Sequence, residues 1–183
     1  MSGGRLVYVV GASGAGKDSV IRYAREALGE SACVLFAHRY ITRPANAQGE
    51  NHIALSKGEF MLRKRHGLFA MDWQSHGFHY GIGVEMNAWL SEGFTVVVNG
   101  SRGYLPVARR RYPTLELVWI TAGPQELTAR LLRRGRESSG EIAARLTRNR
   151  DFGEAPSGEA VHIENDGALE QAGSRFVELL KSA

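Results

Sequence analysis

A short glycine-rich stretch near the amino terminus limits the possible folds of this chain more than any other feature. It follows an apolar run, residues 6–10, and precedes a stretch of helical periodicity; its residues are Gly11, Ala12, Ser13, Gly14, Ala15, Gly16, Lys17, Asp18 and Ser19. Strand, glycine-rich turn and helix are the setting of a phosphate-binding P-loop, in which four residues separate the first glycine from a Gly-Lys pair. Glycines let successive N–H groups point at a phosphate, and the helix N-terminus and Lys17 add positive charge. The stretch therefore predicts a site for the phosphates of ATP.

Three residues of this loop bear directly on the chemistry. We expect Lys17 to bridge the β- and γ-phosphates and to follow the charge that moves during phosphoryl transfer. The next position normally holds a Ser or Thr that binds magnesium, but here it holds Asp18, with Ser19 behind it. An acid early in a helix also interacts favourably with the helix dipole without any metal. Because the predicted strand before Asn99 lacks the terminal aspartate that many P-loop enzymes use, we hypothesise that Asp18 and Ser19 bind Mg²⁺, directly or through water.

Length and composition indicate a single domain. The chain has 183 residues, of which 43% are apolar, enough for one core in a domain covering residues 1–183. No apolar run approaches the length of a membrane span, and residues 1–5 lead directly into the first predicted strand. We therefore expect a cytoplasmic protein without a signal peptide or membrane contact. Its one cysteine, Cys33, lies in an apolar run and is expected in the core.

The charge of the chain is compatible with two kinds of partner. The formal net charge is +4 and the sequence pI about 9.5, as in many nucleic-acid-binding proteins. However, nineteen basic residues are arginines and four are lysines, and no basic–aromatic interleaving or DNA-reading motif occurs. Guanidinium groups bind phosphate at two points, although a general bias toward arginine would also explain part of the excess. We expect a phosphorylated small molecule as substrate and no nucleic acid, and the sequence does not indicate an oligomeric state.

Strands and helices alternate along the chain. The predicted strands are residues 6–10, 33–37, 52–55, 67–74, 94–98, 115–121 and 160–163, and residues 77–81 are predicted as a tight return. The predicted helices follow the P-loop to residue 28 and then cover residues 56–65, 84–91, 105–112, 124–134, 140–150 and 169–180. This alternation predicts an α/β fold, with a parallel sheet of the P-loop NTPase type covered by helices on both faces. Two insertions are expected, an acceptor-binding one at about residues 39–82 and a lid at about residues 134–150.

Polar side chains gather at the edge where an open parallel sheet binds its ligands. Arg39 and Arg43 flank a strand end facing this edge, and we expect Arg43, just before Pro44, to bind the acceptor phosphate. The other candidates would contact sugar hydroxyls or phosphate; they are His52, Tyr80, Asn99, Ser101 and Arg102. For His52 and Tyr80, buried packing is nearly as good an explanation.

Seven arginines lie between residues 130 and 150. Several are explained equally well as a solvated helix face, and Arg145 would then simply pair with Glu141 at i, i+4. The predicted break between two helices near residues 134–136, however, would let side chains close over a bound triphosphate and neutralise the transferring phosphoryl group. We therefore expect catalytic roles for Arg134, Arg145 and Arg136, and surface positions for Arg130, Arg133, Arg148 and Arg150.

Several of these stretches, taken in order, resemble the guanylate kinase superfamily over nearly the whole chain. Its acceptor and lid motifs are matched by Thr42-Arg43, Tyr80-Gly81, Arg134-Gly135 and residues 142–146. The chain is most similar to one branch, the ribose 1,5-bisphosphate phosphokinases, in residues 16–19, 38–44, 50–56, 80–81 and 98–102. This resemblance implies transfer of the γ-phosphoryl group of ATP to the 1-phosphate of ribose 1,5-bisphosphate. The product would be 5-phosphoribosyl 1-diphosphate, formed during the breakdown of organic phosphonates.

The departures from guanylate kinase favour the same branch. That enzyme reads guanine with a glutamate on the strand before Tyr-Gly, a Ser or Thr right after Tyr-Gly, and an aspartate near the next strand end. Here Met71, Ile82 and residues 98–100 stand at these places. A buried guanine would leave its donors unpaired, at about 1–3 kcal/mol for each neutral group. Guanylate kinase remains the alternative, because Asp72 would restore one contact if the alignment shifted by one residue.

The sequence contains no convincing general base, since His38, His76 and His79 are scattered. A phosphate acceptor needs none, because its oxygens are already anionic near neutral pH. Positioning and charge neutralisation by Lys17, Mg²⁺ and the arginines would then be sufficient for catalysis. A second alternative is a non-catalytic guanylate kinase-like binding module, but such a module would be expected to lose the phosphate loop that this chain keeps.

Overall fold

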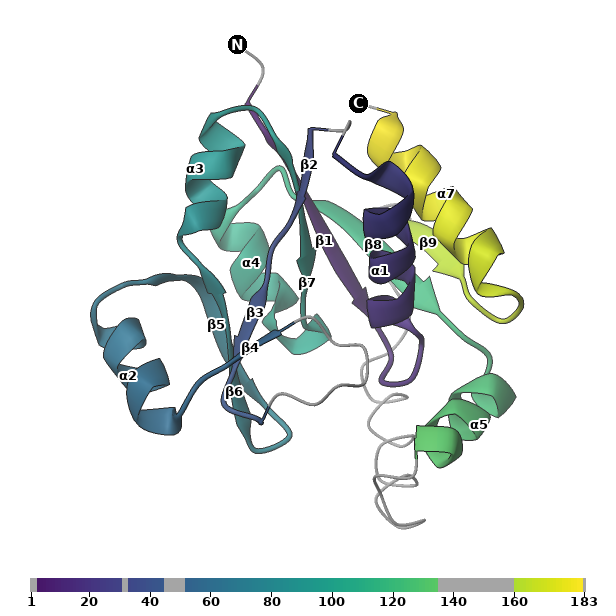
Figure 1. Cartoon of the computed structure of the whole chain (residues 1–183), viewed down its shortest axis with the longest axis horizontal. Coiled ribbons are helices and arrows are strands. Elements are labelled where there is room, and N and C mark those ends of the chain that lie inside the picture. The colour runs from purple at the N-terminus through teal and green to yellow at the C-terminus, as the bar shows by residue number, and fades with distance from the viewer. Residues whose placement is uncertain (1–2, 31–32, 45–51, 135–159, 183) are drawn as a thin grey trace.

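Five strands form a fully parallel sheet at the centre of the protein (Figure 1). The structure is a computed structural model that describes residues 3–30, 33–44, 52–134 and 160–182. The strand order is β2-β7-β1-β8-β9, with β1 at Arg5–Gly11, β2 at Val34–Phe36, β7 at Thr95–Asn99, β8 at Glu116–Thr121 and β9 at Ala160–Glu164. The inner strands are runs of β-branched and other apolar residues, which favour a parallel sheet buried on both faces. The predicted α/β fold is confirmed.

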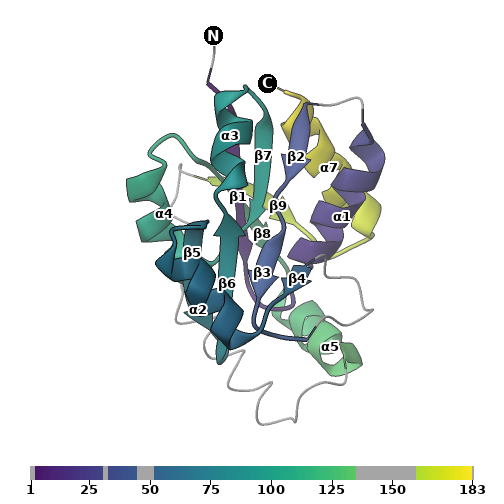
Figure 2. The same ribbon diagram turned by 60° about the vertical axis from the view of Figure 1, so that its left-hand side comes forward.

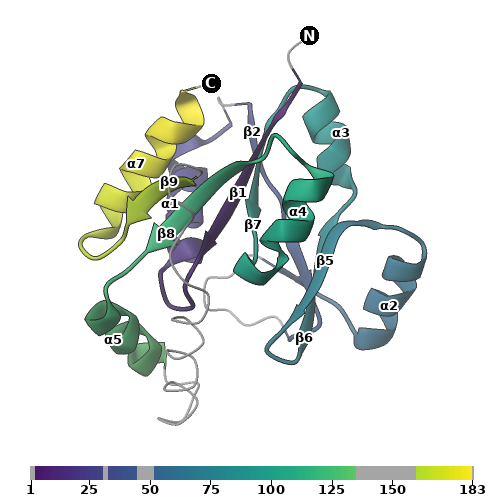
Figure 3. The same cartoon turned by 180° about the vertical axis from the view of Figure 1, so that it is seen from behind.

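Helices cover both faces of this sheet. Alternate residues of a strand point to opposite faces, so Val7 and Val9 belong to one buried cluster, and Leu6 and Val10 to another. Figure 3 shows α4 lying across the face that is hidden in Figure 1. The covering helices are α1 (Lys17–Leu28) and α7 (Leu169–Lys181) on the first face, and α3 (Glu85–Ser91) and α4 (Leu105–Arg111) on the second.

The expected acceptor insertion forms a second, smaller sheet beside the first (Figures 1 and 2). Its strand order is β4-β3-β6-β5, and only β3 and β4 run parallel. Ser56 caps the helix of this insertion, because its Oγ accepts the N–H of Glu59 at 3.1 Å, as the capping-box pattern predicts. The elements are β3 (Arg39–Ile41), β4 (His52–Ala54), α2 (Lys57–Arg65), β5 (Phe69–Ser75) and β6 (Phe78–Gly83).

The tight return predicted for residues 77–81 is wrong. The chain turns at His76 and Gly77, whose φ angles are 50° and 77°, and β6 then pairs antiparallel with β5. Two-residue turns with positive φ match the twist of the strands that they join. The aromatic stretch that follows is therefore a strand of the second sheet.

The predicted burial of residues 33–37 is also wrong. Strand β2 lies at the end of the strand order and its three residues are only half-buried, while Cys33 is exposed. Val34 and Phe36 still pack against the cluster beneath α1. A continuous apolar run does not distinguish a central strand from an edge strand, because one packed face and a neighbouring helix already account for it.

Two further elements complete the described part of the chain. Helix α5 (Pro124–Arg134) follows β8, and a short 3₁₀ helix, η1 (Arg102–Tyr104), follows β7. The second lid helix predicted at residues 140–150 lies outside the described residues, as do Arg136 and Arg145. None of the helices in the described ranges is long and apolar enough to cross a membrane.

Truncation of Phe176 should strongly destabilise the fold. Its side chain on α7 is fully buried in the cluster shared with α1, so Phe176→Ala leaves a cavity and should lower the free energy of unfolding by about 3–5 kcal/mol. Urea unfolding followed by circular dichroism measures this change. The matched control is Leu62→Ala on α2, where the residue is 47% exposed and a change within about 0.5 kcal/mol is expected. Equal effects of the two variants would contradict the assigned core.

Candidate active site

The P-loop joins β1 to α1 at the carboxyl edge of the parallel sheet, where such sheets bind their ligands. Gly14 and Gly16 have φ angles of 92° and 86°, in the left-handed region that glycine adopts without steric cost. Between them the N–H of Ala15 is free of the helix ladder and donates to the C=O of Ala12 at 3.1 Å. The predicted order of strand, glycine turn and helix is confirmed, with Gly16 immediately before the first helical residue.

Contacts from distant parts of the chain hold this loop in place. The C=O of Ala15 accepts hydrogen bonds from Asn165 Nδ2 at 2.8 Å and from the Arg130 guanidinium at 3.3 Å. Arg130 also donates to the C=O of Asn165 at 2.7 Å and pairs with Glu126 at 2.7 Å. A Cβ on Gly16 would come within 2.3 Å of Asn165 Nδ2. The loop is therefore fixed against α5 and the segment after β9.

This arrangement corrects the prediction that Arg130 is a surface residue. Its side chain is only 18% exposed. The i, i+4 pair with Glu126 is typical of a solvated helix face, and nothing local indicates the contacts with residues 15 and 165. Asn165 was missed for the same reason, although its place two residues after the predicted strand 160–163, near the carboxyl edge of the sheet, was a usable signal.

Lys17 lies over the P-loop. Its Nζ donates to the C=O of Gly11 at 3.0 Å and to the C=O of Ala12 at 3.2 Å. These bonds place the ammonium group beside the loop whose N–H groups are the predicted phosphate ligands. The position agrees with the predicted role of Lys17, which remains a prediction.

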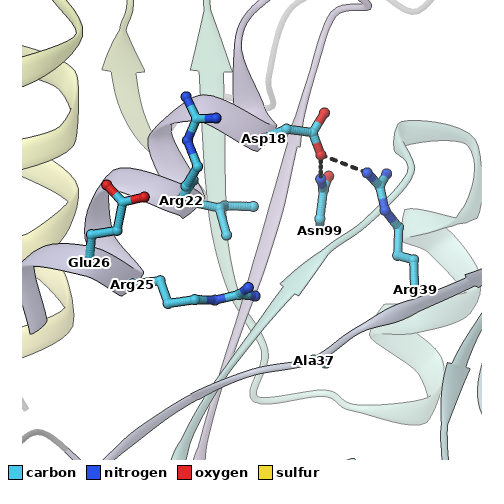
Figure 4. A pocket seen from close by; sticks show the side chains of 8 residues that line it. Asp18, Arg22, Arg25, Glu26, Ala37, Arg39 and Asn99 are labelled. Atoms are coloured by element: carbon cyan, nitrogen blue, oxygen red, sulfur yellow. Dashed lines mark hydrogen bonds and ion pairs between the residues drawn. The ribbon is translucent and has the colours of Figure 1, made fainter. Parts of the chain in front are cut away.

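Three of the predicted site residues meet directly (Figure 4). Asp18 Oδ1 accepts one hydrogen bond from the Arg39 guanidinium and one from Asn99 Nδ2, both at 2.7 Å. The three side chains come from α1, β3 and β7, so this cluster connects the P-loop helix to the second sheet. Because the amide nitrogen of Asn99 faces the carboxylate, its Oδ1 points elsewhere, and this buried oxygen accepts no hydrogen bond within the described residues.

Tyr8, which the sequence did not single out, holds the segment after β7. Its hydroxyl accepts the N–H of Ser101 at 2.9 Å and donates to the C=O of Ser101 at 3.1 Å. Gly100 lies over the ring, since a Cβ there would come within 2.1 Å of Tyr8 Cζ. Burial raises the pKa of Tyr8, so the hydroxyl stays neutral and keeps its proton for this bond. Tyr8 thereby positions Asn99 and Ser101, and burial lowers the pKa of the neighbouring Arg102.

The other predicted acceptor residues lie on the second sheet. Tyr80 stacks on Trp73, its partner in the strand register, with ring centroids 5.6 Å apart. Trp73 in turn contacts Tyr104 of η1, which brings this face of the sheet to the segment after β7. The guanidinium of Arg43 lies 6.0 Å from the centre of the Phe78 ring, and the C=O of Arg43 is 3.4 Å from His52 Nε2. His52 and Tyr80 thus have packing partners.

Asp72 faces away from the Trp73 side of the second sheet. It pairs with Lys64 of α2, on the opposite face of β5, as the alternation along a strand requires. Met71, at the place of the guanine-reading glutamate, is fully buried. Neither residue presents a carboxylate to the aromatic face that carries Tyr80.

No cluster of three or more His, Cys, Asp and Glu side chains in the described ranges would hold a metal ion without other ligands. Arg134 ends α5, next to residues that the structure does not describe. The lid predictions for Arg134, Arg136 and Arg145 therefore stay predictions.

Three relatives of known name are similar to this chain over nearly its whole length. It is 52% identical over 183 residues to the ribose 1,5-bisphosphate phosphokinase PhnN of Thiobacillus denitrificans, covering 100% of this chain and 96% of that protein. It is 52% identical over 178 residues to the protein of the same name from Chromobacterium violaceum, covering 97% and 94%. For the Burkholderia pseudomallei protein of that name the identity is 50% over 182 residues, covering 99% and 97%. A scan against models of protein families finds no match.

Solved structures agree on the fold. A guanylate kinase from Anaplasma phagocytophilum has a TM-score of 0.72 and 15% identity, covering 99% of this chain and 86% of that one. A sugar kinase from Janibacter has a TM-score of 0.56 and 21% identity, covering 98% and 96%. At these identities the likeness concerns the fold alone, and it agrees with the P-loop and the two sheets described above. Since relatives about half identical span nearly the whole chain, the protein belongs to the ribose 1,5-bisphosphate phosphokinase family.

Proposed function

We propose that this protein transfers the γ-phosphoryl group of ATP to the 1-phosphate of ribose 1,5-bisphosphate and forms 5-phosphoribosyl 1-diphosphate. The observation that carries the proposal is the identity of about one half, over nearly the full length, with phosphokinases named for this substrate. We assign the reaction to the cytoplasm and to the breakdown of organic phosphonates.

The donor half of the site has the groups that ATP requires. The loop from Gly11 to Gly16 would bind the phosphates through its N–H groups, and Lys17 would bridge the two terminal ones. Arg130 and Asn165 hold the loop through the C=O of Ala15, so its N–H groups are positioned before the nucleotide binds. Such preorganised donors stabilise the charge of the transition state without further rearrangement.

The acceptor half would bind phosphate without a nucleobase. Arg43 and Tyr80 are the proposed ligands of the acceptor phosphate, and Asn99, Ser101 and Arg102 the proposed contacts to the sugar. Asn99 Oδ1 supports this assignment, because a buried oxygen without a partner in the described part of the chain can accept a hydroxyl proton. Among the described residues, the aromatic face around Trp73 offers no carboxylate to a purine.

The reaction needs no general base. An oxygen of the 1-phosphate forms the new bond to the γ-phosphorus while the bond from that phosphorus to the β–γ bridging oxygen breaks. ADP leaves with the electron pair of that bond, and no proton has to move. Lys17 and the predicted lid arginines, Arg134, Arg136 and Arg145, would neutralise the charge spread over the transferring group.

The Asp18 carboxylate fits a magnesium ion bound together with the phosphates, and Ser19 is the second proposed ligand. Asp18 Oδ1 is occupied by Arg39 and Asn99, whereas Oδ2 makes no hydrogen bond that involves the described residues. Mg²⁺ is commonly bound by one carboxylate oxygen together with phosphate oxygens and water. When bound, the ion would supply further neutralisation of phosphate charge.

The first test compares acceptors. With ATP and Mg²⁺, the kcat/KM for ribose 1,5-bisphosphate should exceed that for GMP by at least about 30-fold, since two unpaired guanine groups cost about 1–3 kcal/mol each. Asp72→Asn should leave this ratio unchanged, because Asp72 pairs with Lys64 on the opposite face of β5. Efficient GMP turnover that Asp72→Asn abolishes would instead establish a guanylate kinase.

The second test concerns magnesium. Asp18→Asn should raise the Mg²⁺ concentration for half-maximal rate about tenfold, a change of about 1.4 kcal/mol, with a smaller effect on the KM for ATP at saturating Mg²⁺. The matched variant Arg39→Gln breaks the same ion pair but keeps the carboxylate, and should leave the Mg²⁺ requirement unchanged. An unaltered Mg²⁺ requirement in Asp18→Asn would contradict the proposal that Asp18 binds the ion.

The third test separates an enzyme from a binding module. Lys17→Ala should lower kcat about 100- to 1,000-fold, because a preorganised charge at the transferring group is lost. Lys57→Ala, at an exposed position at the start of α2, is the control and should keep full activity. A wild-type rate no higher than that of Lys17→Ala would favour a non-catalytic module.

A further inference from the structure

Three aromatic rings form a stack at the boundary between the two sheets. Trp73 of β5 lies on Tyr80 of β6, with ring centroids 5.6 Å apart and an interplanar angle of 4°. The Trp73 ring also contacts Tyr104 of η1, at a centroid distance of 5.6 Å and an angle of 32°. Because β5 belongs to the second sheet and η1 follows β7, Trp73 connects two parts of the chain that both carry proposed acceptor contacts.

These proposed contacts lie beside the two ends of the aromatic stack. Tyr80, at one end, is a proposed ligand of the acceptor phosphate. At the other end, the N–H of Tyr104 donates to the C=O of Ser101 at 3.2 Å, and Arg102 begins η1. An acceptor that reaches from Tyr80 to Ser101 and Arg102 would therefore pass over the indole ring of Trp73, which is half-buried.

The space behind the indole is filled by apolar side chains. Met71 pairs with Ile82 across β5 and β6, and both residues are fully buried. Since alternate residues of a strand share a face, these two side chains lie on the same face as Trp73 and Tyr80. Trp73 and Tyr104 pack against the buried cluster that contains Met71 and Ile82. Removal of the indole would open a space at the edge of this cluster, because neighbouring side chains relax only partly.

We infer that Trp73 is a specificity-determining residue that forms the floor of the acceptor site. The inference rests on the proposed function, because it takes Tyr80, Ser101 and Arg102 as contacts of the acceptor. The ring of a sugar phosphate has an apolar C–H face that the indole can cover. A nucleoside monophosphate adds a base that needs room of its own, and the indole occupies this room. Trp73 thereby excludes nucleotides of any base by its size.

The test measures kcat/KM for ribose 1,5-bisphosphate, GMP and CMP in wild type and in Trp73→Ala. The variant should raise kcat/KM for both nucleotides about tenfold or more, because a steric barrier to the base is removed. It should lower kcat/KM for the bisphosphate about three- to tenfold, because the sugar loses an aromatic contact, and leave the KM for ATP within twofold.

Trp89→Ala is the matched control. Trp89, on α3, is also half-buried and packs against the same buried cluster, but the proposed function assigns it no acceptor contact. Its loss removes an indole of the same size and should increase neither nucleotide activity.

Added indole separates the loss of bulk from a general loosening of the fold. An apolar cavity left by a deleted side chain can bind a small apolar molecule. Indole should therefore return the kcat/KM of Trp73→Ala for GMP and CMP toward the wild-type values. Trp73→Leu keeps an apolar contact with the cluster and replaces Trp73→Ala in these assays if circular dichroism shows that the alanine variant does not fold.

Three outcomes would overturn the inference: no gain for GMP or CMP in the folded Trp73 variant, an equal gain in Trp89→Ala, or a gain that indole does not reverse. If the wild type does not phosphorylate ribose 1,5-bisphosphate, the proposed function fails, and calorimetric binding of GMP and CMP decides the role of Trp73 separately. Tighter nucleotide binding by Trp73→Ala than by wild type, reversed by indole, supports the inference. Equal binding by the two proteins rejects it.

Discussion

The site depends on the parallel arrangement of β1 and β7. Because the two strands run the same way side by side, the glycine loop after β1 and the segment after β7 emerge at one edge of the sheet. The glycine loop supplies backbone N–H groups and leads into α1, and the segment after β7 supplies Asn99 and Ser101. Tyr8, a residue of β1 itself, bonds both backbone groups of Ser101. One strand therefore positions both halves of the site.

The hydrogen bonds of Asp18 connect these halves to the second sheet. An isolated carboxylate near ATP would repel the phosphates, but here it shares one oxygen with Arg39 and Asn99. The guanidinium compensates its charge, and together with the amide it holds the carboxylate between the P-loop helix and the second sheet. Arg130 and Asn165 play a comparable part on the other side, where they fix the loop through a single C=O. The P-loop and the start of α1 are thus supported by polar contacts between segments far apart in the sequence.

Sequence patterns predicted the elements well and the contacts between them poorly. The P-loop, the parallel sheet, the cap at Ser56 and most helix ranges follow from local residue types and periodicity. The edge position of β2, the exposure of Cys33 and the hairpin at His76 do not, because strand order and turn geometry depend on tertiary pairing. The same limit explains Arg130: its neighbours on α5 indicate a surface pair, while its partners at Ala15 and Asn165 lie far along the chain. For Asp18, Arg39 and Asn99, the sequence predicted only that they lie at the same edge of the sheet, and not that they contact one another.

In the proposed reaction, the site passes a phosphoryl group to a phosphate of a sugar that carries no base. Phosphorus-31 NMR of the complete reaction with ATP and ribose 1,5-bisphosphate tests it most directly. Transfer to the 1-phosphate predicts loss of the 1-phosphate resonance, appearance of two mutually coupled diphosphate resonances besides those of ADP, and an unchanged 5-phosphate monoester. A diphosphate formed at the 5-position, or ATP hydrolysis with both phosphate esters intact, would contradict it.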